Sequence, residues 1–565
     1  ARAAEGPGAA AASAPAAAAE ALSGAQAQGA PQPGPEAAEA WEPAPAAEPE
    51  PEIRKKDASS VASLLQQVQD NVARGRASGG ARQGDSAALQ QAFGGALGGP
   101  ASGGAAVASS LGGLLQRLEG AGSCSPASRR SLEEEVLDTL PRLEPARAAE
   151  LIVRMHTTQV LHSAEFLDDL TRALVPSVSR FGSPHLTRIL GTVAAWALVE
   201  SPSEADGRPR LSDDVRGLFN AASTELSLRL MDVAPRDLSH IATALASVGL
   251  AEERFFASLA RAAVARGDRF QPEEIMDLAG AFDRACLVHA PLLEALARCL
   301  RGHLAEVPPR DLLRGLRALA TCCVRDGELG KAVGDHLHSG GVKGSLAPEE
   351  LCQVAWTFCT LGFYHDHMFR AVFHALEDAP VMASDTLCQL YEIHVALKAF
   401  RHDMYKKYEL EEDAVQSLKA HYKKHRGGRL RELRLDRTNE KVHKDVAETL
   451  KHVVDGNIHR QHQTELGLSV DVAVTRRRSA STVVFIEVDG PHSLMRSLDP
   501  SSPQLGHASR VRGAVLLKRY VLQRHGFRMA VISEDLWRSL VDSREKREFL
   551  REVLRNAGVS KARLL

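Results

Sequence analysis

A run of apolar residues near the C-terminal end of the chain leads directly into side chains that could do chemistry. Residues 483–497 read VVFIEVDGPHSLMRS, so Glu487, Asp489 and His492 follow a strongly apolar stretch. A buried strand that ends in two carboxylates and an imidazole is costly unless those groups bind something. The segment therefore raises two interpretations: a metal site that cuts nucleic acid, or a site that only binds it.

Short segments with strand and helix patterns must position these groups. The segments LSVDVAV, TVVFIEV and FRMAVIS are β-branched and bounded by polar residues, which is typical of strands. Strand alternation places Glu487 and Asp489 on one face of the second segment. Helical patterns surround the strands and include SRVRGAVLLKRYVLQRH, EDLWRSL and REKREFLREVLRNAG. The sequence therefore predicts a small α/β domain, with strands at 468–474, 482–488 and 527–533 and with a helix at 509–525.

The chain before this domain repeats itself. The segments PRDLSHIATAL, PEEIMDLAGAF, PRDLLRGLRAL and PEELCQVAWTF share a proline, an acidic residue and a leading Leu or Ile. Proline in the first turn, beside an acidic residue, suits the start of a helix. Each unit holds two amphipathic halves, and such a pair buries its apolar faces only by stacking on the next pair. The sequence therefore predicts an α-solenoid of helical hairpins over 132–400, with anchors 37, 37, 39 and 36 residues apart: Leu238, Ile275, Leu312, Leu351 and Leu387.

The remaining parts of the chain differ in composition. Residues 1–128 are rich in Ala, Gly and Pro, so we expect a disordered extension with one short helix at 58–74. The composition of residues 401–465 is charged and predicts helices. Residues 401–440 form a basic connector to the domain at 441–558. A basic segment within a chain of net charge -2 suits a local nucleic-acid surface. The eight cysteines contain no CxxC pair, which argues against a zinc site and predicts reduced core thiols. No membrane partner is expected, because no run of about 18 apolar residues occurs.

The C-terminal domain resembles a RAP domain, a short module named for its abundance in apicomplexans. The matching pieces are VDVAV, FIEVDGPHS, VRGAVLLKRYVLQRHGFRMAVIS and the DLW corner at Trp537, in matching order over roughly residues 440–558. The repeats upstream are similar to octotricopeptide-type arrays. The resemblance implies a restriction-endonuclease-like fold for the domain, similar to very-short-patch repair nucleases. It also implies an organellar RNA-binding protein, usually mitochondrial and sometimes plastid, that acts in RNA stability, processing, translation or ribosome assembly.

The implied nuclease fold holds a divalent ion with carboxylates on two neighbouring strands, because such an ion prefers hard oxygen ligands. The matching metal ligands here are Asp471 on the first strand and Glu487 on the second. In that fold, a lysine two residues later orients the attacking water, but this chain has Asp489 at the lysine position. His492 is the candidate to replace the lysine as the base, as histidines do in the repair nucleases.

Two sets of polar side chains are candidates for contact with RNA. Guanidinium groups match the geometry of phosphate oxygens, and the C-terminal domain carries Arg476, Arg477, Arg478, Arg510, Arg512, Lys518 and Arg519. Solenoids that read single-stranded RNA present varied polar side chains to one base per unit. The segment SPHLTRILGTV lies one unit plus an insertion upstream and adds Leu186 as a further anchor. Varied polar residues lie two positions after the anchors: Arg188, His240, Asp277, Arg314, Gln353 and Gln389. In both sets, the alternative is a solvated outer face.

The replacement of the lysine by Asp489 favours a nuclease-like fold that binds without cutting. In this alternative, Asp489 forms a turn with the next residue, and Glu487 pairs with Lys518 or Arg519. We therefore expect a mitochondrial RNA-binding protein without a cofactor, in which the solenoid grips single-stranded or ribosomal RNA and the RAP domain contacts phosphates. Organellar ribosomal or RNA-processing proteins are further expected partners, and the plastid is the alternative location. The competing functions are an Mg²⁺-dependent endoribonuclease that uses Asp471, Glu487 and Asp489, and a protein-binding scaffold.

Overall fold

The computed structural model describes most of the chain after residue 125. The described residues are 113–116, 126–158, 163–200, 210–338, 346–377, 382–432, 440–477, 479, 481–498, 509–560 and 563–564. The extension expected at 1–128, with its helix at 58–74, lies almost entirely outside them. Within these ranges, no helix has both the length and the apolar character needed to cross a membrane.

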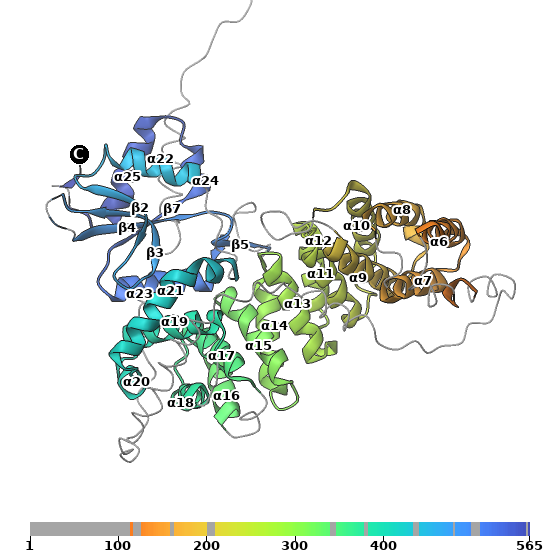
Figure 1. The fold of residues 1–565 in the computed structure, drawn as a ribbon, viewed down its shortest axis with the longest axis horizontal. Helices are drawn as coiled ribbons and strands as arrows, with labels where there is room; N and C mark the ends of the chain where they lie inside the picture. Colours follow the sequence, from red (N-terminus) through yellow and green to blue (C-terminus); the bar gives the residue numbers. More distant parts are fainter. Residues whose placement is uncertain are drawn as a thin grey trace, which may run out of the picture. The chain divides into compact units, whose positions relative to one another are not determined.

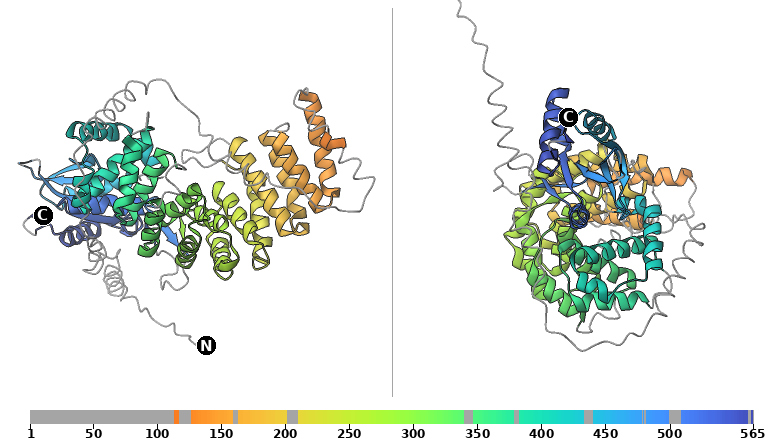
Figure 2. Two further views of the ribbon diagram at one scale, coloured as in Figure 1. Left: turned by 90° about the horizontal axis from the view of Figure 1, so that it is seen from below. Right: turned by 90° about the vertical axis from the view of Figure 1, so that its left-hand side faces the viewer.

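Paired helices form a solenoid-like run in the part of the chain before residue 440 (Figure 1, Figure 2). The helices of a first row pack on one another in sequence order and are α7 (Pro145–Thr158), α9 (Ser183–Glu200), α11 (Pro235–Ser247), α13 (Pro272–Arg284), α15 (Pro309–Thr321), α17 (Pro348–Leu361) and α19 (Ser384–Phe400). A second row packs in the same way and contains α8 (Ala164–Leu174), α10 (Asp213–Ser227), α12 (Glu253–Val264), α14 (Ala290–His303), α16 (Gly327–His338) and α18 (Asp366–Glu377). The rows are preceded by α6 (Pro126–Thr139) and followed by α20 (His402–Lys407) and α21 (Glu412–Glu432). The predicted run of helical hairpins is therefore confirmed.

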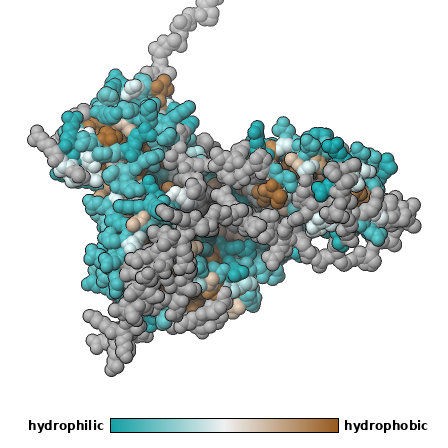
Figure 3. All heavy atoms as spheres, in the orientation of Figure 1, coloured by the Kyte–Doolittle hydropathy of each residue, from teal (hydrophilic) through white to brown (hydrophobic). Residues whose placement is uncertain are grey.

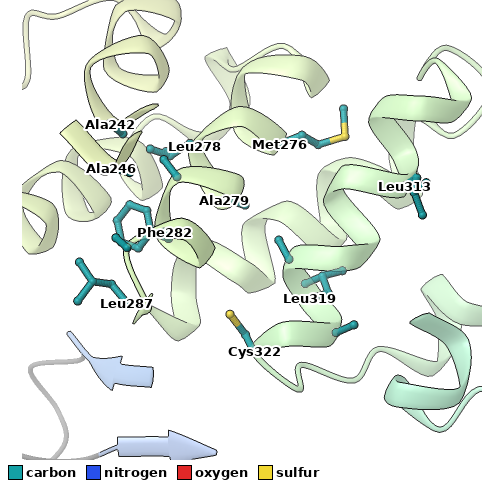
Figure 4. Close-up of a cluster of buried hydrophobic side chains, with 14 of the residues drawn as sticks. Ala242, Ala246, Met276, Leu278, Ala279, Phe282, Leu287, Leu313, Leu319 and Cys322 are labelled. Carbon is teal, nitrogen blue, oxygen red and sulfur yellow. The ribbon is translucent and has the colours of Figure 1, made fainter. Parts of the chain in front are cut away.

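The repeated sequence signature lies at the start of the first-row helices. Proline occupies an initial position of α11, α13, α15 and α17, where its missing N–H costs no helical hydrogen bond. Leu351 is half-buried, and the other predicted anchors are buried: Leu238, Ile275, Leu312 and Leu387. Figure 4 shows part of the core that forms between successive first-row helices, with Ala242, Leu278 and Leu319 contributed by α11, α13 and α15.

Four first-row helices end in a residue with left-handed backbone geometry. These residues are Gly249, Cys286, Cys323 and Gly362, with φ angles of 75°, 55°, 52° and 75°. Their spacing follows the repeat, so this type of helix end belongs to the repeated unit. A residue with a Cβ pays about 1–2 kcal/mol in this conformation. The two cysteines are therefore strained at positions where the two glycines are not.

Two substitutions at these helix ends are expected to have opposite effects on stability. Gly362→Ala should lower the free energy of unfolding by about 1 kcal/mol, because it introduces a Cβ at a left-handed position. Cys323→Gly should raise the free energy of unfolding by about 0.5 kcal/mol, because relief of the backbone strain exceeds the entropy lost by glycine. Thermal unfolding followed by circular dichroism would measure both changes, and equal destabilisation by the two variants would contradict this explanation.

A mixed four-stranded sheet forms the centre of the C-terminal domain. The strand order is β2-β3-β4-β7, antiparallel except between β4 and β7, and the strands are β2 (Asn457–Gln463), β3 (Ser469–Thr475), β4 (Thr482–Asp489) and β7 (Met529–Ser533). The three strands expected from the sequence are present, so that prediction is confirmed. The expectation of helix throughout 401–465 is wrong at β2, because this polar segment forms a strand that pairs with β3 at one edge of the described sheet.

Helices cover the two faces of this sheet and divide its side chains between two cores. One face meets α22 (Glu440–Leu450), α24 (Glu534–Ser539) and α25 (Ser543–Asn556), and its core includes Val472, Ile486 and Trp537. The other face shares Ala473 and Phe485 with the core of the repeats. Alternate strand residues point to opposite faces, so β3 and β4 are buried on both sides. Figure 3 shows that the described part of one outer surface is mainly hydrophilic, with small apolar patches.

A second, smaller sheet joins the repeats to the C-terminal domain. The amides of Arg496 and Leu498 donate to the carbonyls of Cys286 and Val288, with N–O distances of 3.0 and 2.8 Å. Arg496 also forms an ion pair with Glu253 of α12. The sheet has three strands, in the order β1 (Leu287–Val288), β5 (Leu494–Ser497) and β6 (Ser509–Val511), and β1 and β5 are parallel.

Helix α23 (Gly513–Arg524) completes the junction, because it packs on the domain's sheet and against α15, α17 and α19. Gly513 lies so close to the repeats that an added Cβ would be 2.0 Å from the Ala320 carbonyl oxygen and 2.7 Å from Thr360 Cγ2. Arg512, at the start of α23, is buried and lies 3.7 Å from an oxygen of Asp283 on α13. The sequence therefore allows a close backbone contact between the domain and the last repeats.

Candidate functional site

A cavity of about 460 Å³ lies between the C-terminal sheet and the last repeats. Side chains from α17, α19 and α21 line it on one side, and residues of β2, β3, β4, α22 and α23 line it on the other. Three of the four predicted catalytic residues, Asp471, Glu487 and His492, are among its lining residues, together with Lys518. The structure therefore brings most of the predicted chemical groups to one enclosed place.

Glu487 is the most deeply buried acid in this cavity. Lys518 Nζ donates to Glu487 Oε2 at 2.6 Å and to the Ser469 carbonyl oxygen at 3.3 Å. Glu487 Oε1 is buried and has no hydrogen-bond partner among the described residues. Burial raises the pKa of Glu487 to about 6, although Lys518 acts in the opposite direction. The predicted pairing of Glu487 with a basic residue of the helix is confirmed, and one carboxylate oxygen is left over.

Asp471 is held in place by its neighbours. Its Oδ2 accepts a hydrogen bond from the Val488 amide at 2.8 Å, and its Oδ1 lies 3.8 Å from Nδ1 of His443. His443 is buried on α22 and was not among the residues predicted from the sequence. Its position within the apolar pattern of EKVHKDVAETL, next to Val442, was the available signal.

Asp489 is turned to a different partner and does not line the cavity. Its Oδ1 accepts a hydrogen bond from Nη2 of Arg519, and both side chains are buried. Lys518 and Arg519 are adjacent on α23, so one helix neutralises both Glu487 and Asp489. The structure therefore does not support Asp489 as a catalytic residue, because its charge is already compensated.

The donor set does not fit the predicted metal site. Asp471 and Glu487 each use one carboxylate oxygen in a short hydrogen bond within the protein. Among the described residues, no group of three or more His, Cys, Asp or Glu side chains is arranged to hold a metal ion. His492 lies in the turn after β4 and is half-buried at the cavity wall.

The predicted phosphate-binding residues of the domain fall into two groups. Arg476 and Arg477 are exposed after β3, with Arg477 Nε 2.8 Å from an oxygen of Asp455, and Arg510 is exposed on β6. Arg478 lies outside the described residues. Lys518 lines the cavity. The structure does not support two residues as phosphate contacts, because they are buried in ion pairs with acidic side chains: Arg512 and Arg519.

The polar residues that lie two positions after the repeat anchors are only partly accessible to solvent. Arg314 is exposed but donates to Asp277 of the preceding repeat and to Asp311, with N–O distances of 2.5 Å in both contacts. Burial lowers the pKa of half-buried His240 to about 4, so this imidazole is neutral at pH 7. The structure does not support Gln389 as a base-reading residue, because it is buried. Arg188 and Gln353 are half-buried.

Several lining residues were not predicted as site residues. Glu392 of α19 accepts hydrogen bonds from Trp356 Nε1 at 2.6 Å and from the Tyr422 hydroxyl at 3.2 Å. These contacts fix two aromatic rings at the wall of the cavity. Gln461 of β2 lines the cavity with a left-handed φ of 47°, and Arg426 of α21 lines it as well. No local sequence signal connects these residues, because they come from different helices and strands.

The buried acid should give this protein a characteristic pH dependence of stability. The pKa of Glu487 is about 6 in the folded protein and 4.5 in its ordinary state, so the folded protein holds the proton more tightly. Its stabilising contribution is therefore complete below pH 4.5 and is lost as the pH rises through 6. The wild type should therefore lose about 2 kcal/mol of unfolding free energy between pH 4.5 and pH 7 that Glu487→Gln does not lose, because glutamine does not titrate in this range. Urea unfolding at both pH values measures this difference, and a pH-independent difference would contradict it.

The cavity combines a carboxylate oxygen that has no partner within the described part of the chain, two fixed aromatic rings, and basic residues from four different parts of the fold. Such a site can bind a polar ligand that donates a hydrogen bond. The chain matches no protein-family model, and a search of curated proteins finds no match either. The function is therefore inferred from the cavity and from the surfaces around it.

Proposed function

We propose that this protein binds RNA in an organelle, most simply the mitochondrion, through its repeats and a C-terminal domain of the RAP type. The domain would have a restriction-endonuclease-like fold that holds RNA without cutting it. The RNA would be single-stranded or ribosomal, and organellar ribosomal or RNA-processing proteins would be further partners. The protein would then act in RNA stability, processing, translation or ribosome assembly.

The observation that carries this proposal is a group of basic residues on the elements around the cavity. Helix α21, helix α22 and strand β2 each contribute to the cavity wall through Arg426, His443 and Gln461. The same three elements carry exposed cations beside these residues: Lys423, Lys424, Lys441, Lys444 and Arg460. Cations grouped in this way can contact several phosphates of one strand.

The order of elements in the domain supports the same proposal. The RAP-like pieces VDVAV and FIEVDGPHS lie on β3 and β4, and the longer piece spans β6, α23 and β7. The DLW corner lies on α24, where Trp537 is buried and its Nε1 donates to Asp445 at 3.0 Å. The pieces that carry the resemblance are thus the central strands and helices of one domain.

RNA binding should depend on salt and on the exposed cations of α21. We expect a short single-stranded RNA to bind with a salt slope that falls by about 1.4 in the double variant Lys423→Gln/Lys424→Gln, since each lost phosphate contact removes about 0.7. The matched control is Arg254→Gln/Arg261→Gln, which removes two exposed cations from α12. Fluorescence anisotropy across a range of salt concentrations gives these slopes. A salt-independent affinity, or the same slope in all three proteins, would reject the proposal.

Ultraviolet crosslinking of the tagged protein in its own cells tests the organellar part of the proposal. Short discrete footprints on mitochondrial transcripts or ribosomal RNA are the expected result, and footprints on plastid RNA would assign the alternative organelle. If the amount of crosslinked RNA recovered does not exceed background, the RNA-binding role is rejected and a protein-binding scaffold becomes the favoured function of the repeats.

A metal-dependent endoribonuclease is the second candidate, because Asp471 and Glu487 both line the cavity, although their donor set does not fit a divalent ion. Its test is RNA cleavage that requires Mg²⁺ and disappears in Glu487→Ala. The ion pair between Lys518 and Glu487 favours binding over cleavage, because it occupies a carboxylate oxygen that the metal would need.

A further inference from the structure

Three polar atoms at the cavity have no hydrogen-bond partner among the residues that the structure describes. They are Glu487 Oε1, His443 Nδ1 and Arg426 Nη1, and all three are buried. The side chain of Glu487 is only 6% exposed. Native proteins leave few buried polar atoms unsatisfied, so such a group points to a missing partner. Here the missing partner must accept a hydrogen bond at one place and donate one at another.

The charges of the cavity decide which part of an RNA could enter it. Four acids line the interior, namely Glu392, Asp471, Glu487 and Glu534, whereas the described lining residues include only two side chains with a permanent positive charge, Arg426 and Lys518. A phosphate would be repelled by this interior. The exposed cations of α21, α22 and β2 instead offer a place for phosphates outside the cavity.

The remaining lining residues suit a flat, partly apolar group. The walls include Trp356 and Tyr422 together with the aliphatic side chains Leu468, Val470, Val488, Val515, Leu517 and Val521. Bases that are taken out of a strand are held in this way, by aromatic and aliphatic contacts and by hydrogen bonds to their polar edges. A cavity of about 460 Å³ is large enough for one such group and a few waters.

We propose that this cavity receives a single nucleobase of the bound RNA, with Glu487 Oε1 accepting a hydrogen bond from a base N–H and Arg426 donating to a base acceptor. The inference rests on the proposed RNA-binding function and names the part of the RNA that the cavity recognises. Each of the four RNA bases carries at least one N–H donor and one acceptor, so this pattern selects for a base and not for one particular base. The phosphates on either side of the base lie on the cations of α21 and α22.

Glycine 427 offers a way to block the cavity without disturbing the fold. Gly427 lines the cavity, is exposed on α21, and an added Cβ would meet no atom within 4 Å. Gly427→Trp therefore places a large side chain at the cavity wall. Gly217→Trp is the matched control, because Gly217 is also within a helix, has the same open space and does not line the cavity.

The test is calorimetric titration of the full chain at pH 8 with GMP, AMP, CMP, UMP and ribose 5-phosphate, which lacks a base. We expect at least one nucleotide to bind more tightly than ribose 5-phosphate, and to bind about 10-fold or more weakly to Glu487→Gln and to Gly427→Trp. Gly217→Trp should bind as wild type does.

The outcomes separate this inference from the proposed function. If no nucleotide binds better than ribose 5-phosphate, or if Gly427→Trp binds nucleotides as tightly as Gly217→Trp, the base-binding inference is wrong. Salt-dependent binding of single-stranded RNA in the same preparation would then leave the RNA-binding function standing. Loss of both activities in the wild-type protein would reject the two together.

Discussion

Replacement of Arg519 by methionine is expected to lower the free energy of unfolding by about 3–5 kcal/mol. Arg519 is 8% exposed and Asp489, its partner, is 7% exposed. The ion pair is buried between α23 and the end of β4. Because water has little access to this place, it cannot replace the lost guanidinium. The variant would leave Asp489 charged and buried, and the energy lost is mainly that of the unpaired carboxylate rather than of the contact itself.

Two further variants separate this explanation from a general effect of the substitution. The double variant Arg519→Met/Asp489→Leu should recover most of the loss, because it removes both charges from the buried site. Arg544→Met removes an arginine from the exposed pair with Glu548 on α25, and should leave stability unchanged within error. Urea unfolding of the four proteins measures these differences. Equal losses in Arg519→Met and in Arg544→Met would show that burial of the pair is not the cause.

Gly513→Ala is expected to separate the C-terminal domain from the repeats, at a cost of about 2–3 kcal/mol. The new Cβ would lie 2.0 Å from the Ala320 carbonyl oxygen, and a backbone atom cannot move aside as a flexible side chain can. Helix α23 must therefore withdraw from α15 and α17. The pairing of β1 with β5 should weaken at the same time, because β5 and α23 belong to one short stretch of chain.

Hydrogen exchange at two amides would report this separation directly. The Arg496 and Leu498 amides donate to carbonyls of the repeats, so their exchange should accelerate in Gly513→Ala while amides of β3 and β4 stay protected. Gly217→Ala is the control, because its added Cβ meets no atom within 4 Å and alanine favours the helix. Unchanged exchange at Arg496 would mean that the contact at Ala320 does not hold the two parts together.

The sequence was informative where a pattern recurs and where hydrophobicity alternates. The repeat of Pro, acid and Leu locates α11, α13, α15 and α17, and β-branched segments locate β3, β4 and β7. Strand β2 carries no such pattern, since its sequence NIHRQHQ is polar and its pairing comes from β3. Strands β1, β5 and β6 are too short to show any period.

Only the part of the candidate site that lies within the C-terminal domain could be predicted from the sequence. Glu487 and Asp471 follow from adjacent strands, and the pairing of Glu487 with Lys518 follows from a basic helix next to an acidic strand. Glu392 and Arg426 could not be assigned, because their role depends on how the domain meets the repeats. The same contact explains the incorrect expectation for Arg512, which is buried because α23 has protein on both sides.

The small sheet that joins the repeats to the domain also has a consequence for how the chain is made. Strand β1 begins at Leu287, but its partner β5 begins at Leu494. At about 5–20 residues per second, a ribosome needs roughly 10–40 s to add the intervening chain. The faces of α15, α17 and α19 that later meet α23 are also made before their partner, and they have no contact with α23 until it is synthesised. Until the C-terminal domain emerges, this uncovered surface can bind to other molecules incorrectly. A chaperone that covers the surface during translation would increase the yield of correctly assembled molecules.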